Sequence, residues 1–180
     1  YYTGLCEHRK GLVNEEVVLK LELLMKKAGV TVHDRAVIAP AIQKAALTGA
    51  PAAAIELSDG RIITGKTSSL LGASSALLLN ALKALAGIDD SVHLISPTII
   101  EPIQHLKVDH LGNRNPRLHT DEALIALSIC AASDSKAELA MEQLDKLRGC
   151  ELHSSVILSS VDEKVFRRLG INLTCEPAYA

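Results

Sequence analysis

Hydrophobic residues recur at helical spacing near the start of the chain. Asn14 can accept hydrogen bonds from free amides at a helix start, and Gly29 can end the same helix in a left-handed conformation. Pro40 suits the first position of a second helix, which Gly49 ends. The apolar face of the first helix comprises Val17, Val18, Leu21, Leu24, Met25 and Ala28. We interpret residues 1–50 as the end of a longer helical region.

After Pro51 the pattern changes to short apolar runs of strand length. The runs "AAAIEL" and "RIITG" are separated by Asp59-Gly60, a dipeptide that favours the tight turn of a β-hairpin. The next run, "SLLGASSALLLNALKALAG", is interrupted by Asn80 and Lys83. We therefore predict a buried helix from about Ser69 to Ala86 rather than a membrane span.

The remaining chain alternates between strand and helix patterns. "SVHLISP" predicts a strand that ends at Pro97, "TIIEPIQHLK" a short helix, and "TDEALIALSICAA" a longer one. Ser135 with Glu138 indicates a capping box for a further helix. The segment "SSVILSSVDEKVFRRLGINLTCEP" predicts strand, helix and parallel strand, with Ser160 and Glu163 as a second capping box.

These elements predict an α/β fold. We expect a three-layer helix–sheet–helix sandwich with a mixed sheet over residues 51–180, preceded by the short helical region at residues 1–50.

Composition narrows the range of partners. The net charge of −2 gives no electrostatic reason to expect nucleic acid or an anionic membrane. Aromatic residues amount to 2%, which leaves few platforms for stacking bases. The four cysteines are widely spaced and no secretory signal opens the chain, so we expect reduced thiols and a cytoplasmic location. Because no initiator Met is present, we expect a fragment of a longer protein.

The string "GRIITGKT" at residues 60–67 matches the pattern of a phosphate-binding P-loop. Ile62 and Ile63 oppose that interpretation, because β-branched residues resist the left-handed conformations that wrap phosphate and favour strands instead. Gly60 suits the hairpin turn, and Gly65 the exit from the second strand. We therefore favour a hairpin over a P-loop.

Two polar stretches remain as candidate ligand sites. The first is expected at the start of the buried helix, where the helix dipole favours an anion; alternatively Thr67 or Ser68 merely caps the helix. The second runs from a loop into a helix start, where Arg114 or Arg117 could bind phosphate and His119 could transfer protons. Alternatively, Thr120 caps that helix and the acidic residues match its dipole. The first stretch comprises Lys66, Thr67, Ser68 and Ser69, and the second Asn113, Arg114, Asn115, Arg117, His119, Thr120, Asp121 and Glu122.

Weaker candidates lie elsewhere. Glu101 and Gln104 follow the predicted strand end, where active-site clefts form in α/β sheets, and Glu176 could face the same side. Cys150 and His153 have half the spacing of a zinc site, but with no second half in the sequence we favour a structural cysteine and a surface histidine. We expect no metal site, and no cofactor is evident.

Several long segments carry a resemblance to a known family: "GKTSSLLGAS", "LISPTIIEPIQHLK", "LGNRNPRLHTDEALIALSICAA" and "GCELHSSVILSSVDEKVFRRLGINLTCEP". The chain closely resembles the C-terminal part of the uncharacterised bacterial protein family 0371, also catalogued as domain of unknown function 1846. The resemblance implies a much longer protein, whose N-terminal half carries a glycine-rich, phosphate-loop-like stretch. It names no reaction.

In the order of its elements the chain is also similar to the cytidine-deaminase fold. The deaminase motif positions correspond to residues 73–75 and 98–101, which are Ala-Ser-Ser and Thr-Ile-Ile-Glu. They hold no zinc ligand and no catalytic Glu at the motif position, so the resemblance implies a zinc-free relative and excludes zinc deamination.

Two hypotheses follow. In the first, the chain is the C-terminal α/β domain of a larger enzyme and binds a phosphorylated or nucleotide-like small molecule, with His119 and Glu101 as candidate catalytic residues. In the second, it is a structural or oligomerisation domain that supports a catalytic N-terminal half. We expect that missing half and a second copy of the chain as partners. The ligand-binding candidates are Lys66, Thr67, Ser68, Ser69, Asn113, Asn115, Arg117 and Asp121.

Overall fold

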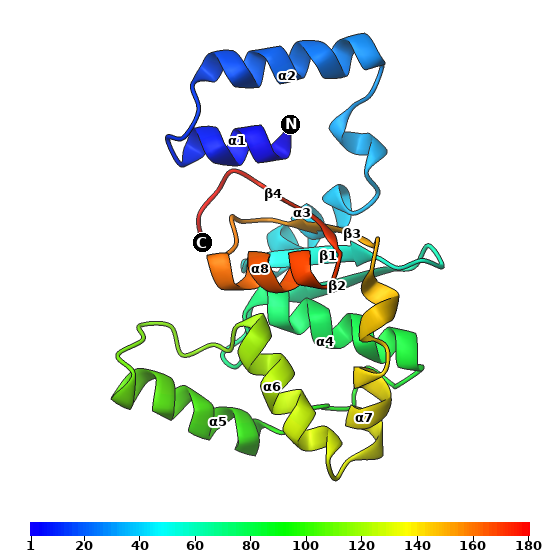
Figure 1. Cartoon of the computed structure of the whole chain (residues 1–180), viewed down its shortest axis with the longest axis vertical. Helices are drawn as coiled ribbons and strands as arrows, with labels where there is room; N and C mark the ends of the chain where they lie inside the picture. The colour runs from blue at the N-terminus through cyan, green and yellow to red at the C-terminus, as the bar shows by residue number, and fades with distance from the viewer.

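A computed structural model describes residues 1–180 and has a four-stranded sheet at its centre (Figure 1). The strand order is β2-β1-β3-β4, in which β1 is antiparallel to both neighbours and β3 is parallel to β4. The sheet is therefore mixed, and the predicted α/β class is confirmed. The strands are β1 (Ala52–Glu56), β2 (Ile62–Lys66), β3 (Glu151–Ser154) and β4 (Asn172–Cys175).

The β1–β2 pair confirms the predicted hairpin. Ile62 and Ile63 pair with Glu56 and Ile55, and Gly60 has a φ of +81° in the turn. The string "GRIITGKT" thus forms a turn and a strand rather than a phosphate-binding loop. Gly65, which we predicted at the strand exit, instead lies inside β2.

The reason for glycine at position 65 is the close approach of a helix. A Cβ atom on Gly65 would lie 2.2 Å from the backbone nitrogen of Leu77 in α4 (Ala73–Ala86). Because real Cβ atoms do not approach backbone that closely, only glycine lets α4 pack on β2 in this way.

Helices cover both faces of the sheet, because neighbouring strand residues point to opposite sides. Ala54 packs with Val37 and Ala41 of the segment around α3 (Ile38–Thr48). Ala53 and Leu152 instead belong to the main core beneath α4 and α8 (Ser160–Arg168). Since α3 also packs on the sheet, the division of the chain at residue 50 stays a prediction.

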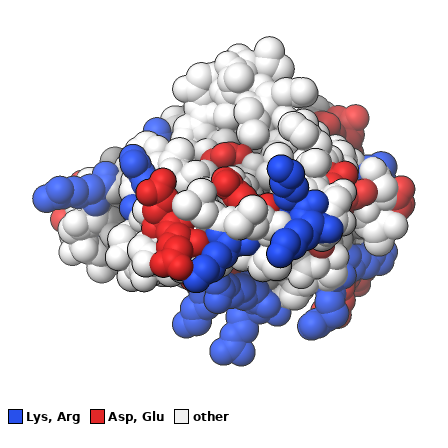
Figure 2. Space-filling model, turned by 90° about the horizontal axis from the view of Figure 1, so that it is seen from above, with Lys and Arg blue, Asp and Glu red and all other residues white.

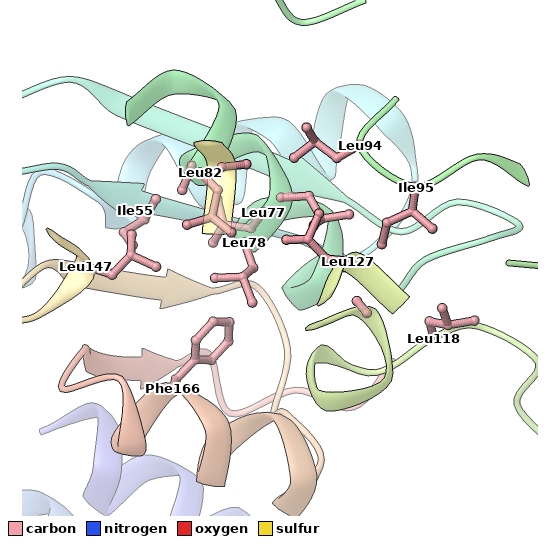
Figure 3. Packing of buried hydrophobic residues seen from close by; sticks show 14 of the residues in the cluster. Ile55, Leu77, Leu78, Leu82, Leu94, Ile95, Leu118, Leu127, Leu147 and Phe166 are labelled. Carbon is pink, nitrogen blue, oxygen red and sulfur yellow. The ribbon is translucent and has the colours of Figure 1, made fainter. Parts of the chain in front are cut away.

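The main core is built almost entirely from aliphatic side chains (Figure 3). Leu77, Leu78 and Leu82 project from α4 toward Ile55 of the sheet, and the chain's one phenylalanine, Phe166, closes the cluster from α8. Burying each of these side chains contributes about 1.5–3 kcal/mol. The core therefore holds α8, and with it the residues of its first turn, against the sheet.

The remaining helices form a hairpin at one end of the molecule and a helical layer at the other (Figure 1). In this helical hairpin, Asn14 caps α2 as predicted by accepting from Val17 N at 3.3 Å, and Gly29 ends α2 with a φ of +67°. None of the helices combines the length and the apolar composition that a membrane span requires. These helices are α1 (Tyr2–Arg9), α2 (Glu15–Ala28), α5 (Pro97–His105), α6 (Thr120–Ala131) and α7 (Ser135–Met141), with the short turns η1 (Val32–Asp34), η2 (Leu106–His110) and η3 (Leu144–Leu147).

Several predicted boundaries were wrong. No strand forms at residues 91–97; Leu94 and Ile95 are buried in the core, so burial rather than strand pairing explains that apolar run. The strand predicted after Ser154 lies earlier, at β3. The last two capping residues are likewise each one position earlier, because Asp134 and Ser159 accept from the first free amides of α7 and α8.

Candidate functional site

The stretch from Lys66 to Ser69 does not lie at a helix start. Lys66 ends β2, and α4 begins only at Ala73, after a loop. Within that loop the Ser68 hydroxyl accepts from the amides of Leu70 and Leu71, at 3.2 and 3.1 Å, and so closes a local turn. The prediction that these residues form the start of the buried helix was therefore wrong; that they bind a ligand stays a prediction.

The two predicted polar stretches nevertheless meet in space. Arg117 Nε donates to the carbonyl of Ser68 at 2.7 Å, although the residues are 49 positions apart. Leu118 N donates to the carbonyl of Leu70 at 3.0 Å, and Gln104 Nε2 donates to the carbonyl of Ser69 at 2.9 Å. We call this junction of residues 68–71 and 113–122 the loop junction.

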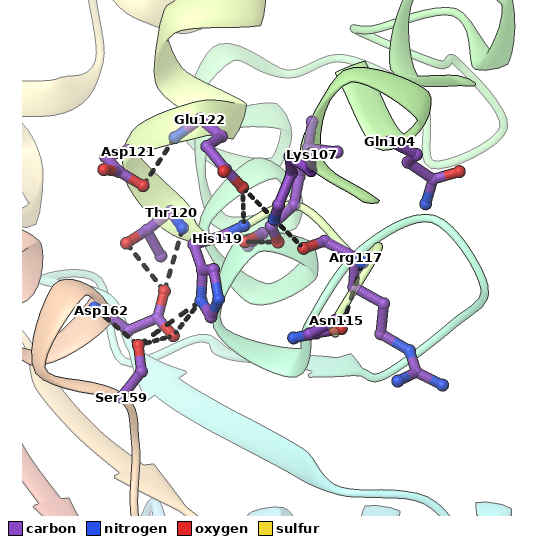
Figure 4. A network of polar contacts seen from close by, with 12 residues as sticks. Gln104, Lys107, Asn115, Arg117, His119, Thr120, Asp121, Glu122, Ser159 and Asp162 are labelled. Carbon is purple, nitrogen blue, oxygen red and sulfur yellow. Dashed lines mark hydrogen bonds and ion pairs between the residues drawn. The ribbon is translucent and has the colours of Figure 1, made fainter. Parts of the chain in front are cut away.

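At one side of the loop junction, His119 pairs with a carboxylate from the far end of the chain (Figure 4). His119 precedes α6, and its Nδ1 lies 3.1 Å from Oδ2 of Asp162 in the first turn of α8. Asp162 also accepts from Thr120 N at 2.9 Å, Thr120 Oγ1 at 3.0 Å and Ser159 Oγ at 2.8 Å. The carboxylate is therefore held on both oxygens and fixes the imidazole ring.

This pairing shifts the pKa of both His119 and Asp162. The hydrogen bond that His119 donates to Asp162 raises the pKa of His119, against an opposing effect of burial. Burial alone would raise the pKa of Asp162, but hydrogen bonds from His119, Thr120 and Ser159 lower it instead. With Nδ1 donating to Asp162, Nε2 of His119 has no hydrogen-bond partner in the chain and is the atom free to exchange a proton with a ligand.

A buried lysine supports the same loop from behind. Lys107 is 3% exposed and donates from Nζ to Glu122 Oε2 at 2.6 Å and to the carbonyl of Arg117 at 2.7 Å. Glu122 in turn accepts from the amide of His119 at 2.8 Å. This ion pair fixes the backbone on both sides of Leu118.

The other predicted residues of the second stretch shape the loop. Asn115 Oδ1 accepts from the amide of Arg117 at 3.1 Å, and Asp121 Oδ1 accepts from the amide of Glu122 at 2.8 Å. Asn113 contributes its amide to the carbonyl of Lys107. Thr120, which we predicted as the cap, donates its hydroxyl to Asp162 instead, because the helix begins one residue after His119.

The terminal guanidinium nitrogens of Arg117 make no hydrogen bond, and Lys66 makes none through its side chain; neither residue has an acidic partner within 4.0 Å. Figure 4 shows the guanidinium extending away from the network. Glu101 is exposed on α5 and lies outside the network, because the strand that would have brought it to a cleft does not form.

The sequence missed Lys107, Ser159 and Asp162. Asp162 and Ser159 could be recognised only as the start of α8, and their distance to His119 depends on how α8 packs. Lys107 is one of nineteen basic residues and carries no signal of its burial in the sequence.

A second polar cluster lies on the other face of the sheet. His153 is completely buried rather than on the surface as we predicted; its Nδ1 lies 2.8 Å from Thr174 Oγ1 and its Nε2 3.0 Å from Glu176 Oε1. Burial lowers the pKa of His153. Glu176 therefore does not face the loop junction. Cys150 belongs to the main core, apart from His153, and the structure has no group of three His, Cys, Asp or Glu side chains placed to hold a metal ion.

Comparison with known proteins identifies the family. The family profile described as domain of unknown function DUF1846, C-terminal, matches residues 33–180. The chain belongs to this family. It is 56% identical over 179 residues to a UPF0371 protein of Corynebacterium efficiens, 54% to one of Corynebacterium urealyticum and 51% to one of Streptococcus pyogenes. The resemblance seen in the sequence is thus confirmed.

The family relationship also gives the scale of the whole protein. Each of these three alignments covers 99% of this chain but only 36% of the relative. The chain therefore spans about a third of the length of the curated relatives that it matches, and the profile leaves α1 and α2 outside the C-terminal domain.

Proposed function

We propose that the chain is the C-terminal α/β domain of a larger enzyme and binds a phosphorylated or nucleotide-like small molecule at the loop junction. The observation that carries the proposal is the His119–Asp162 pair, which fixes the ring through Nδ1 and leaves Nε2 free. A histidine oriented in this way is suited to general acid–base catalysis near neutral pH.

We assign to Arg117 the binding of the ligand's anionic group. Its Nε is anchored on the Ser68 carbonyl, so the guanidinium plane is fixed while both terminal nitrogens remain free. Two parallel N–H groups match two oxygens of a phosphate or carboxylate. We propose Lys66, which also has no acidic partner, as a second cation of the ligand site.

The rest of the site is assigned to the larger protein. Neither His119 nor Arg117 lines any of the main pockets of this chain. The chain spans about a third of the length of its relatives. We therefore assign the residues that would cover His119 and Arg117 to the rest of the protein. On this proposal His119 is the proton-transfer group of a site shared between two parts of one chain.

A second candidate function rests on α2. This helix leaves Leu19, Leu23 and Leu24 exposed by 51, 58 and 59%. Figure 2, seen from the side of α2, has charges of both signs interspersed and a broad area without charged side chains. Exposed leucines grouped on one helix are typical of protein contacts, which favours a structural domain that contacts the preceding part of the protein or a second copy.

The finer likeness to the cytidine-deaminase fold belongs with these proposals. The hairpin and the buried helix α4 occur in the expected order, and β1 is antiparallel to the rest of the sheet. We propose a zinc-free relative of that fold in which residues 91–97 remain a loop.

A thermal-shift experiment on the full-length protein separates the two functions. Inorganic phosphate and ATP should raise the melting temperature, and Arg117→Ala combined with Lys66→Ala should abolish the rise. Lys136→Ala, an exposed site on α7, is the matched control and should leave it intact. Unchanged ligand stabilisation in the double variant would reject the site. A changed oligomer size in Leu23→Asp with normal ligand binding would favour the structural role.

A further inference from the structure

A mostly apolar cavity of about 350 Å³ opens beside the loop junction. It lies between α4, the loop that precedes α5, and residues 68–71. Its walls include Leu70, Leu79, Val92, Ile95 and Ile100. Cavities that hold small ligands have volumes of roughly 300–1,000 Å³ and are lined mainly by apolar side chains with a few polar groups.

Two polar side chains of α4 reach this cavity from the same side of the helix. Asn80 and Lys83 are three positions apart, so they project from one face. Lys83 is 7% exposed and uses one N–H to donate to the carbonyl of Asp90 at 2.7 Å. An ammonium group has three N–H donors, so two remain without a hydrogen bond, and the carboxylate of Asp90 lies 3.9 Å from Nζ as an ion-pair partner.

Asn80 offers the complementary group. Its Nδ2 donates to the carbonyl of Thr64 at 3.0 Å, and its Oδ1 has no hydrogen bond. No buried side-chain oxygen or nitrogen in the structure lacks a partner, so Oδ1 is accessible, and Asn80 is one of the residues that line the cavity. The cavity wall thus presents donors from Lys83 next to an acceptor from Asn80.

We propose that this cavity binds the base of a nucleotide, a flat ring whose edge carries an acceptor beside a donor. The ring would lie between the leucine, valine and isoleucine side chains, and its edge would pair with Lys83 and Asn80. Hydrogen bonds to a charged donor are stronger than those between neutral groups.

The inference rests on the proposed function and specifies its ligand. Ser68 lines the cavity, and its carbonyl accepts from Arg117 Nε at 2.7 Å, so the guanidinium is hydrogen-bonded to a residue of the cavity wall. A base in the cavity would therefore place a phosphate within reach of Arg117. This arrangement makes a nucleoside monophosphate the ligand that fits both halves.

The test measures binding to the full-length protein by calorimetry, with inorganic phosphate, the four common nucleosides and their monophosphates as probes. At least one monophosphate should bind about tenfold or more tightly than phosphate. Lys83→Met, which keeps the buried stem, and Val92→Phe, which fills the cavity, should each remove that advantage and leave phosphate binding unchanged. Lys136→Met is the control on an exposed lysine.

The outcomes separate the two proposals. If phosphate binds through Arg117 but no base improves binding, or if the preference survives both cavity variants, the cavity is not the base site and the proposed function stands. If nucleosides bind through Lys83 and Arg117→Ala has no effect on monophosphates, the cavity stands and the phosphate site falls. Should no probe bind, both proposals are overturned. Two differently placed variants keep the test valid if one fails to fold.

Discussion

Replacing Asp162 by asparagine tests the central pair of the site. The variant keeps the shape of the side chain and removes its charge. Asp162 is 7% exposed and accepts hydrogen bonds from His119, from Ser159 and twice from Thr120. Asparagine has only one acceptor oxygen, so its NH₂ group meets at least one of these donors.

The loss of stability follows from these bonds. A hydrogen bond to a charged group contributes about 1.5–3 kcal/mol, and one between neutral groups about 0.5–1.5 kcal/mol. Because the site borders solvent, we expect the four weakened bonds to lower the free energy of unfolding by roughly 2–4 kcal/mol. Asp121→Asn removes an exposed charge from the first turn of α6, two residues after His119, and should cost about 0.3–1 kcal/mol.

The pH dependence has a definite sign. The raised pKa of His119 means that protonated His119 stabilises the fold. That contribution is fully present below the unfolded value of about 6.5 and is lost as pH rises through the higher folded pKa. Asp162→Asn removes it, so the stability gap between parent and variant should be wider near pH 6 than near pH 9.

The assay is a histidine-resolved NMR titration combined with thermal unfolding at both pH values. We expect the pKa of His119 to fall in Asp162→Asn, since burial then acts without the carboxylate. An unchanged His119 titration, or a gap that widens with pH, would refute the assignment. A loss of stability no larger than that of Asp121→Asn would show that the carboxylate does not organise the site.

Two further predictions concern the framework. Gly65→Ala places a Cβ against the backbone of Leu77, so we expect the free energy of unfolding to fall by roughly 2–4 kcal/mol in thermal unfolding. Gly112 has a φ of +69° and open space around it, so Gly112→Ala should lower that free energy by only about 1 kcal/mol. Equal losses would contradict the close packing of α4. His153 has a lowered pKa, so it stabilises the fold when neutral, and that contribution is lost as pH falls below about 6.5. His153→Gln should therefore lower stability at pH 8 but make its decline toward pH 5 shallower, and a steeper decline would count against a buried neutral ring.

Local signals in the sequence were sufficient to predict the β1–β2 hairpin and the helix α2. Asp59-Gly60 and the two isoleucines have one low-energy arrangement, and Asn14 and Gly29 act on amides and carbonyls a few residues away. The strand predicted at residues 91–97 was wrong for a physical reason. Apolar residues report burial, and burial in this segment comes from α4 rather than from a neighbouring strand.

The site was predictable only in part. His119 and Arg117 were found because cationic and titratable residues gather in a polar loop. Their partners were not, because Asp162 and the Ser68 carbonyl reach them through the packing of α8 and of the loop after β2. The contacts that orient both candidate residues join positions more than forty apart, a separation at which single-sequence patterns carry no information.

The helix α4 explains why the two halves of the proposed site lie side by side. Gly65 lets it approach β2, and this contact fixes both the cavity face with Asn80 and Lys83 and the start of the helix after Gly72. At that start, Ser75 Oγ donates to the carbonyl of Leu118 at 2.8 Å, and Gly72 N donates to the same oxygen at 3.3 Å. Leu118 lies between Arg117 and His119, so the helix α4 positions the cavity and the loop junction together. A ligand that spans both therefore meets a surface already arranged before it binds, which lowers the conformational entropy that binding must overcome.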